Sequence, residues 1–416
     1  MGPSILLVID GLGYSPNLKG NAVLAAKTPN LDMLWSCYPH TLIKAAEEEV
    51  GLYFGNIGNS EVGHMAVGTG RIIQSPLQRI NSSIEDGSFD TNDTFLQAIY
   101  NTQTRMSKLH LVGMISSAGV HAELMHMVKL LELAKSQNAK NVFLHCILDG
   151  RDTGPKEALT YLDMLNEHIK RIGIGQIASI GGRAYAMDRN TNWYRTKLAY
   201  DTMCGQSTTQ AFKSAKAIIE DSYAQGQDDE QIPPSLIQPQ GSIQNNDSVI
   251  FTNFREDRVR QITQAFCDPI FDGFVRDVHP QELHIVTMTE YAKSFPVHSA
   301  FAKNIPPNTL SDVLESHELR QLHIAETEKY AHTTYFFNGG REEAHPHEEF
   351  LNVPSDPPEQ FLNNPGMRAR NITADHGNAE EMIDLKTQQL SKDHTINPVP
   401  FIVAHNQLKQ TTANLR

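Results

Sequence analysis

The sequence predicts an α/β protein of two domains, each a mainly parallel sheet flanked by helices. The chain has 416 residues, which exceeds one ordinary hydrophobic core, so two domains are expected. Residues 5–9 form a continuous apolar run that ends at Asp10, as in a buried parallel strand whose carboxyl end carries a polar group. Between Leu109 and Met187, strand-like runs alternate with helical spacing, the pattern of a parallel sheet.

The amino-terminal part also predicts two helix starts. Thr28-Pro29 opens a helix expected across residues 30–35, because proline suits the first helical position. A second helix is expected to begin near Asn59-Ser60-Glu61. Serine at such a position is a common N-cap, but the free N–H groups of a helix start also favour a phosphate group. This stretch alone leaves both interpretations open. Residues 71–84 show little periodicity and fit a crossover connection.

The middle of the chain continues the α/β pattern. Its expected elements are a helix over residues 124–134 and strands over residues 109–114, 141–148 and 248–251. Residues 221–247 are polar and rich in Gln, Pro and Asp, so an exposed loop or weakly ordered insertion is expected. Residues 304–308 read as a linker, and a helix from 309 to 318 begins a new unit.

Composition excludes several classes of partner. The formal net charge of −13 argues against nucleic-acid and anionic-membrane binding, which need a basic surface. The sequence is 40% hydrophobic with a mean hydropathy of −0.37, and no apolar run approaches the roughly 20 residues of a membrane span. Four scattered cysteines without a Cys-x-x-Cys pair predict neither a disulfide framework nor a zinc knuckle. No room for a signal peptide precedes the run at residue 5, so a cytoplasmic protein is expected.

A mixed set of oxygen and nitrogen donors suggests a metal site. Each member alone is more often a cap or a surface residue, but three of them follow predicted strands. Such a set suits Mn²⁺ or Zn²⁺. Its members are Asp10, Ser60, Asp375, His376 and His394.

A second group consists of arginines beside Gly or Asp near strand ends. One guanidinium group can donate two parallel hydrogen bonds to the oxygens of a phosphate or carboxylate. Several arginines together therefore suggest a site for a doubly anionic small molecule. They are Arg151, Arg183, Arg189, Arg255 and Arg258. His121 is a candidate acid, base or phosphate donor. Lys329 either supplies charge near a phosphoryl group or pairs with Glu326 or Glu328.

Several long motifs then carry a resemblance that covers nearly the whole chain in order. They are Asp10-Gly11-x-Gly13, Gly58-Asn59-Ser60-Glu61-Val62-Gly63-His64, Leu148-Asp149-Gly150-Arg151-Asp152-Thr153, Tyr185-Ala186-Met187-Asp188-Arg189, Asn253-Phe254-Arg255-x-Asp257-Arg258, the run from Glu326 to Gly340, Ala374 to Glu380, and His394-Thr395-x-Asn397-Pro398-Val399-Pro400. In these motifs the chain resembles the cofactor-independent (2,3-bisphosphoglycerate-independent) phosphoglycerate mutases of the alkaline-phosphatase superfamily.

The resemblance implies an isomerase that interconverts 3-phosphoglycerate and 2-phosphoglycerate through a phosphoserine at Ser60. Residues 1–75 and 309–416 would form a discontinuous phosphatase-type domain with two Mn²⁺ ions, and residues 76–308 an inserted phosphotransferase domain. Asp10, Ser60, Asp375 and His376 match the ligands of one metal, and His394 matches a ligand of the other. The residues that match substrate contacts are His121, Arg151, Asp152, Arg183, Arg189, Arg255, Arg258 and Lys329. A monomer is expected.

The chain departs from the family pattern at four places. Residues 52–56 replace the usual Pro-Asp-Gly-Gln approach to the serine, and Ser117, Ala118 and Ala122-Glu123 replace the usual neighbours of His121. A segment near 355–371 is missing that would carry Asp-x-x-x-His, two ligands of the second metal, and the part after residue 404 is short. The expected result is one tightly bound metal and weak or no mutase activity. A metal-dependent phosphatase and an inactive relative that binds phosphoglycerate remain the alternatives.

Overall fold

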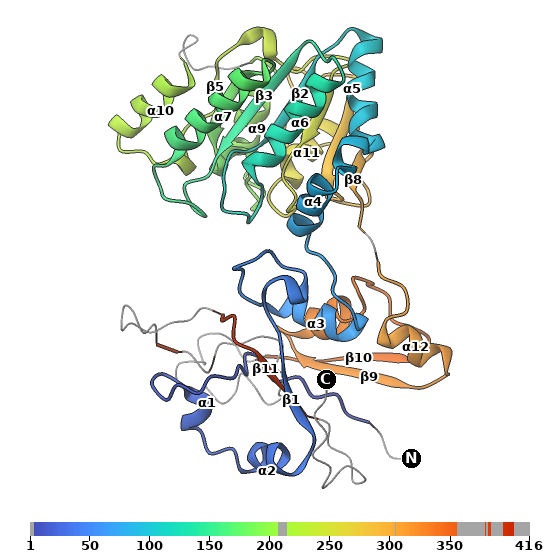
Figure 1. Ribbon diagram of the computed structural model, residues 1–416. Coiled ribbons are helices and arrows are strands. Elements are labelled where there is room, and N and C mark those ends of the chain that lie inside the picture. Colours follow the sequence, from blue (N-terminus) through green and yellow to red (C-terminus); the bar gives the residue numbers. More distant parts are fainter. Residues whose placement is uncertain are drawn as a thin grey trace. The chain divides into compact units, whose positions relative to one another are not determined.

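The computed structural model describes residues 4–206, 214–303, 305–355, 379, 382–383 and 394–402 (Figure 1). Contacts divide the chain into two compact units. Unit 1 comprises residues 1–78 and 304–416, and unit 2 comprises residues 79–303. The predicted boundaries, after residues 75 and 308, lie within a few residues of these. The assignment of one unit to metal binding and of the other to substrate binding stays a prediction.

Unit 2 is built on a seven-stranded sheet with strand order β5-β4-β3-β2-β6-β7-β8. All neighbouring pairs are parallel except β4 with β5. The strands are β2 (Leu109–Met114), β3 (Val142–Leu148), β4 (Gln176–Gly182), β5 (Ser235–Leu236), β6 (Ser248–Phe251), β7 (His284–Thr289) and β8 (His298–Phe301). The predicted strands at 109–114, 141–148 and 248–251 are confirmed as β2, β3 and β6, and the predicted α/β class is confirmed with them.

Helices cover both faces of this sheet (Figure 1). One face carries α5 (Asp93–Arg105), α6 (Leu124–Ser136) and α7 (Ala158–Ile172), and the other carries α9 (Trp193–Met203) and α11 (Arg260–Cys267). Helix α6 confirms the helix predicted over 124–134, and its buried residues Leu124, Val128 and Leu131 follow helical spacing. A continuous core of Val112, Tyr200, Ile262 and further apolar side chains lies under α9 and α11. Further helices of unit 2 are η2 (Ser88–Thr91), α8 (Arg183–Ala186), α10 (Ala215–Ala224), η3 (Asp229–Gln231) and η4 (Pro239–Gly241).

Two expectations for connecting segments were wrong. Residues 71–84 were expected to lack periodicity, but α4 (Pro76–Glu85) occupies most of them and buries Leu77 and Ile80 at helical spacing. Residues 221–247 are not an exposed insertion. This segment contains β5, and its apolar residues Ile232 and Ile243 are fully buried.

Buried carboxylates explain why the polar segment 221–247 is ordered. Asp229 accepts hydrogen bonds from the backbone N–H groups of Glu157 (2.8 Å) and Ala158 (2.9 Å), so it caps the start of α7. Asp247 lies 3.0 Å from Nε2 of His110 on β2. The other ring nitrogen of His110 lies 3.0 Å from His145 Nε2, and His145 Nδ1 lies 2.8 Å from Ser179 Oγ. Composition alone could not reveal this chain of partners, which runs from Asp247 across β2, β3 and β4.

Unit 1 contains two small sheets in its described residues. β1 (His40–Ile43) pairs antiparallel with β11 (Val399–Ile402), and β9 (Gln321–Glu326) pairs parallel with β10 (Glu348–Val353). Parallel pairing in the described part of unit 1 is thus limited to β9 and β10, less than the predicted mainly parallel sheet. Its helices are α1 (Ala22–Ala25), α2 (Pro29–Cys37), η1 (Glu47–Val50), α3 (Ser60–Thr69), α12 (Leu310–Ser316) and the π-helix η5 (His332–Phe336). The predicted helices at 30–35 and 309–318 are confirmed as α2 and α12.

The strand predicted over residues 5–9 was wrong. These residues have no regular structure, and Ile5 is 83% exposed. A parallel strand is stabilised by neighbours on its edges and by layers on its faces, and none of the described strands pairs with this segment. Across the described residues, no helix combines the length and the hydrophobicity needed to cross a bilayer.

Candidate functional site

Ser60 is the first residue of α3 and is 6% exposed. The N-cap is Asn59, whose side-chain oxygen accepts from the backbone N–H of Val62 at 3.1 Å. The capping interpretation of the sequence therefore applies to Asn59, and the Ser60 hydroxyl lies at the helix start with a different partner.

That partner is Lys329. Its ammonium nitrogen Nζ donates to Ser60 Oγ at 2.6 Å and forms a close ion pair with Asp10. Lys329 thus places a positive charge beside the serine. Glu328 instead accepts a hydrogen bond from Ser355. A positive charge next to a hydroxyl favours its alkoxide form, which is the nucleophilic form.

The described metal candidates fit a cation site in part. Asp10 and Ser60 present two hard oxygen donors to one positive charge, the Lys329 ammonium, as they would to a divalent ion. His394 Nδ1 lies 2.8 Å from the carbonyl oxygen of Gly58, so in the neutral ring the metal-binding lone pair is on Nε2. Asp375 and His376 lie outside the described residues. Within the described ranges, no three His, Cys, Asp or Glu side chains gather as a metal site.

Glu326 belongs to the same surroundings, although it was not predicted as a site residue. Burial raises its pKa, and the negative charge of Asp10 adds to the rise. Glu326 is the last residue of β9, and the sequence shows only that it lies three residues before Lys329.

A second cluster lies in unit 2 at the carboxyl ends of four adjacent strands. His121 follows β2, Asp149 and Asp152 follow β3, Arg183 follows β4, and Arg255 follows β6. The strand order reverses between β2 and β6, which is where open α/β sheets bind ligands. The backbone N–H of Phe254 donates to the carbonyl of His121 at 2.9 Å, joining the two loops at this point.

Arg183 organises the carboxylates of this cluster. Its side chain is 1% exposed and contacts Asp149 at 2.6 Å and Asp152 at 2.5 Å. Asp149 also accepts from Ser116 Oγ at 2.7 Å. Because a buried guanidinium needs paired acceptors, Arg183 holds the loop after β3 in place. The prediction that it contacts substrate is untested.

His121 lies between two carboxylates, 3.7 Å from Asp152 and 3.5 Å from Asp257. Burial and the positive charge of Arg183 lower the pKa of His121 to about 4, so its ring is neutral near pH 7. Asp257 was missed by the sequence analysis as a site residue, although it lies inside a quoted motif. It pairs with Arg189 at 2.7 Å and with Arg255 at 3.3 Å.

The arginines share one electrostatic environment. Burial and the positive charges of Arg183, Arg189 and Arg151 lower the pKa of Arg258. Arg151 itself is more exposed and lies 3.5 Å from Glu230. A group of cations that disfavour one another is stabilised by an anion, so this cluster is suited to binding phosphate or carboxylate groups.

Comparison with known families agrees with this architecture. Residues 80–293 match the family described as the BPG-independent PGAM N-terminus, and residues 367–416 match the metalloenzyme superfamily. These matches define the class as a metalloenzyme-superfamily protein with a second α/β unit within its chain. Over 477 aligned residues, the chain is 39% identical to the 2,3-bisphosphoglycerate-independent phosphoglycerate mutase of Acaryochloris marina, covering 100% of this chain and 89% of the relative. The chain belongs to the family of 2,3-bisphosphoglycerate-independent phosphoglycerate mutases.

Further relatives support this membership. The corresponding enzyme of Nostoc punctiforme is 40% identical, with 98% of this chain and 87% of the relative covered. A solved structure of Leishmania mexicana phosphoglycerate mutase at low cobalt concentration is similar with a TM-score of 0.67 and 25% identity, covering 95% of this chain and 88% of that one. The alignment with the Acaryochloris marina protein is 477 residues long, whereas this chain has 416. That relative therefore contains residues with no counterpart here.

Proposed function

We propose that this chain interconverts 3-phosphoglycerate and 2-phosphoglycerate through a phosphoserine at Ser60, as an isomerase of glycolysis. The observation that carries the proposal is the contact of Ser60 Oγ with Lys329 Nζ at 2.6 Å, with Asp10 on the same ammonium group. Family membership supplies the substrate class.

The reaction consists of two phosphoryl transfers. In the first, the Ser60 hydroxyl gives up its proton and Oγ bonds to phosphorus as the ester bond to the 3-oxygen breaks, and that oxygen takes up a proton to leave glycerate. In the second, the 2-hydroxyl of glycerate gives up its proton and attacks phosphorus, the Ser60 ester breaks, and Ser60 Oγ takes up a proton. Lys329 stabilises the negative charge on Ser60 Oγ in both steps, and the start of α3 offers N–H groups to the phosphoryl oxygens.

Divalent metal ions, proposed here to be Mn²⁺, would neutralise phosphoryl oxygens and lower the pKa of the serine hydroxyl when bound. Asp10, Ser60, Asp375 and His376 would hold one ion, and His394 would contribute to a second. The second site lacks the Asp-x-x-x-His ligands, so weak turnover is proposed.

Unit 2 is proposed to bind the carboxylate and phosphate groups of the substrate. The neutral ring of His121 can exchange a proton with a substrate hydroxyl, and Asp152 is held in place by Arg183. The proposed anion contacts are Arg151, Arg183, Arg189, Arg255, Arg258 and His121.

The proposed setting is the reducing cytoplasm, with the chain as a monomer that binds neither nucleic acid nor membranes. All four cysteines are free thiols, as is usual in a reducing compartment. The net charge of −13 supports the exclusion of polyanionic partners.

Ser60→Ala tests the proposal. With excess Mn²⁺, the variant should lose 3- to 2-phosphoglycerate conversion and the mass increase of a phosphorylated serine, whereas Ser36→Ala on exposed α2 should keep both. The fold of Ser60→Ala should persist, because Asn59 and not Ser60 caps α3.

The outcomes distinguish the candidate functions. Retained turnover in Ser60→Ala would exclude the covalent route. Release of inorganic phosphate by the unaltered chain, without mutase product, would identify a phosphatase instead. Substrate binding without either product would identify an inactive relative.

A further inference from the structure

We propose that Glu348 is a positioning residue that holds the turn carrying Lys329 against Ser60. The inference rests on the proposed role of Ser60 as nucleophile. Glu348 is the first residue of β10 and is 6% exposed. It contacts neither Ser60 nor Lys329 in the described structure, so its effect would pass through the groups that it binds.

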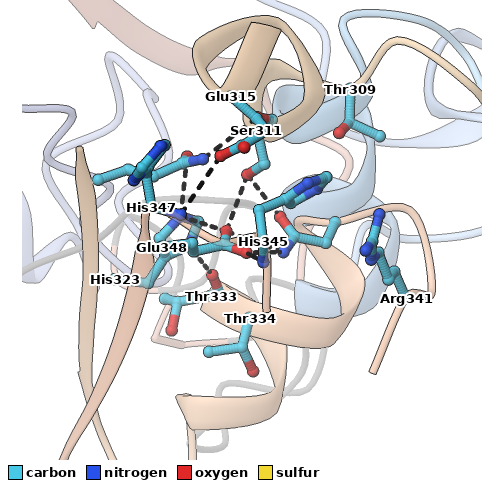
Figure 2. A network of polar contacts seen from close by, with 12 residues as sticks. Thr309, Ser311, Glu315, His323, Thr333, Thr334, Arg341, His345, His347 and Glu348 are labelled. Carbon is cyan, nitrogen blue, oxygen red and sulfur yellow. Dashed lines mark hydrogen bonds and ion pairs between the residues drawn. The ribbon is translucent and has the colours of Figure 1, made fainter. Parts of the chain in front are cut away.

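Glu348 is the centre of a buried polar network (Figure 2). One carboxylate oxygen lies 3.0 Å from Ser311 Oγ on α12 and 3.0 Å from His323 Nε2 on β9. The side-chain amide of Asn338 donates to both oxygens, at 2.9 and 3.1 Å, and the backbone N–H of His345 donates to the second at 2.9 Å. Burial would raise the pKa of Glu348, but the hydrogen bonds from His323, Asn338 and His345 outweigh it and lower the pKa to about 2. The carboxylate is therefore ionised and fully occupied.

His323 connects Glu348 to the π-helix η5. Its Nδ1 lies 2.6 Å from the carbonyl oxygen of Thr333. In a π-helical pattern that carbonyl would accept from Asn338, but the N–H of Asn338 bonds to Thr334 instead. His323 thus satisfies a carbonyl that the local helix leaves without its helical partner.

Thr333 connects directly to Lys329. The backbone N–H groups of His332 and Thr333 both donate to the carbonyl oxygen of Lys329 at 3.0 Å. Glu348 therefore holds the segment after Lys329 at two points, through His323 at Thr333 and through Asn338 at the end of the turn. Lys329 must place one ammonium group on both Ser60 and Asp10, so a small shift of its backbone would separate these groups.

Glu348→Gln tests the inference with little change of volume. Because Asn338 Nδ2 faces both carboxylate oxygens, either orientation of the glutamine amide sets a donor against a donor. The kcat of the mutase should fall by about 100-fold, the loss expected for a displacement of about 1 Å at the reacting groups, with KM nearly unchanged. Glu349→Gln, at the exposed next position of the same strand, should keep the kcat of the unaltered chain.

A double-mutant cycle separates positioning from general damage. If Glu348 acts through Lys329, Glu348→Gln should lower kcat by less than about twofold in a Lys329→Met background, because the coupled partner is already absent. Equal losses in both backgrounds would overturn the inference.

A chemical readout keeps the test independent of turnover. Acetylation of Lys329 by acetic anhydride is measured by mass spectrometry. The extent of acetylation should rise several-fold in Glu348→Gln relative to Glu349→Gln, while the melting temperature of the chain is unchanged. An unchanged Lys329 reactivity would overturn the inference even in an active enzyme. If the unaltered chain shows no mutase activity but Lys329 becomes reactive as expected, the proposed function fails and the positioning role stands.

Discussion

His121 shows how a single residue acquires its chemistry from its neighbours. Two carboxylates lie within 3.7 Å of its ring, yet burial and Arg183 lower its pKa to about 4. The ordinary value is about 6.5. The folded chain therefore binds fewer protons than the unfolded chain between these two values, so the contribution of His121 to stability falls as pH drops through this window.

The His121 ring is expected to stay neutral to about pH 4 in a titration followed by NMR. Urea unfolding of the unaltered chain should lose stability more steeply between pH 6.5 and 4 than unfolding of His121→Gln, which lacks the titrating group. A titration midpoint near 6.5 would show that the ring is solvated and not enclosed by Arg183.

Sequence reasoning at the residue scale was limited by chemically equivalent neighbours. Asn59 and Ser60 are both good N-caps, and only the observed hydrogen bond to Val62 shows which of them caps α3. Asp257 was missed for a similar reason. Its neighbours in the motif are arginines, and its role depends on His121, which is distant in the sequence.

At the scale of elements, α3 and η5 must approach closely to bring Ser60 and Lys329 together. Gly68 permits this approach, because a Cβ at this position would overlap the carbonyl oxygen of Phe337, directly after η5. A backbone carbonyl cannot move aside as a flexible side chain can.

Gly68→Ala is therefore expected to destabilise unit 1 by about 2 kcal/mol, as overpacking does, and to reduce phosphorylation of Ser60. Val67→Ala, on an exposed part of the same helix, serves as the matched control. Urea unfolding measures the first effect and mass spectrometry the second. Equal stability of the two variants would mean that α3 and η5 can separate without cost.

Helices and strands were predicted correctly where their own apolar spacing determines the structure. The predictions were wrong where contacts with residues distant in the sequence determine it. The strand and helix runs of unit 2 between 109 and 148 followed from apolar spacing, because each buries its own apolar residues. The apolar run at 5–9 reads as a strand, but a strand also needs a partner, and none of the described strands supplies one. Residues 221–247 failed in the opposite direction, because the partners of Asp229 and Asp247 lie far away in the sequence.

At the scale of the whole molecule, the length difference from relatives bears on metal content. The proposed first site has Asp10, Ser60, Asp375 and His376, whereas the second retains His394 without the Asp-x-x-x-His ligands. One imidazole does not hold Mn²⁺ against water. We expect one tightly bound ion per chain after dialysis against Mn²⁺, measured by elemental analysis, with weak conversion of 3- to 2-phosphoglycerate. Two bound ions with strong turnover would mean that other residues complete the second site.

The antiparallel strand β5 has a consequence for how unit 2 behaves at high concentration. An open sheet edge offers unpaired backbone groups to which another molecule can add a strand. Here the edge strand is only two residues long, Ser235–Leu236, and Pro233, Pro234 and Pro239 flank it. Proline has no N–H to donate, so a neighbouring chain finds almost no ladder to extend. The β5 edge of unit 2 is therefore protected against edge-to-edge aggregation, even in concentrated solution.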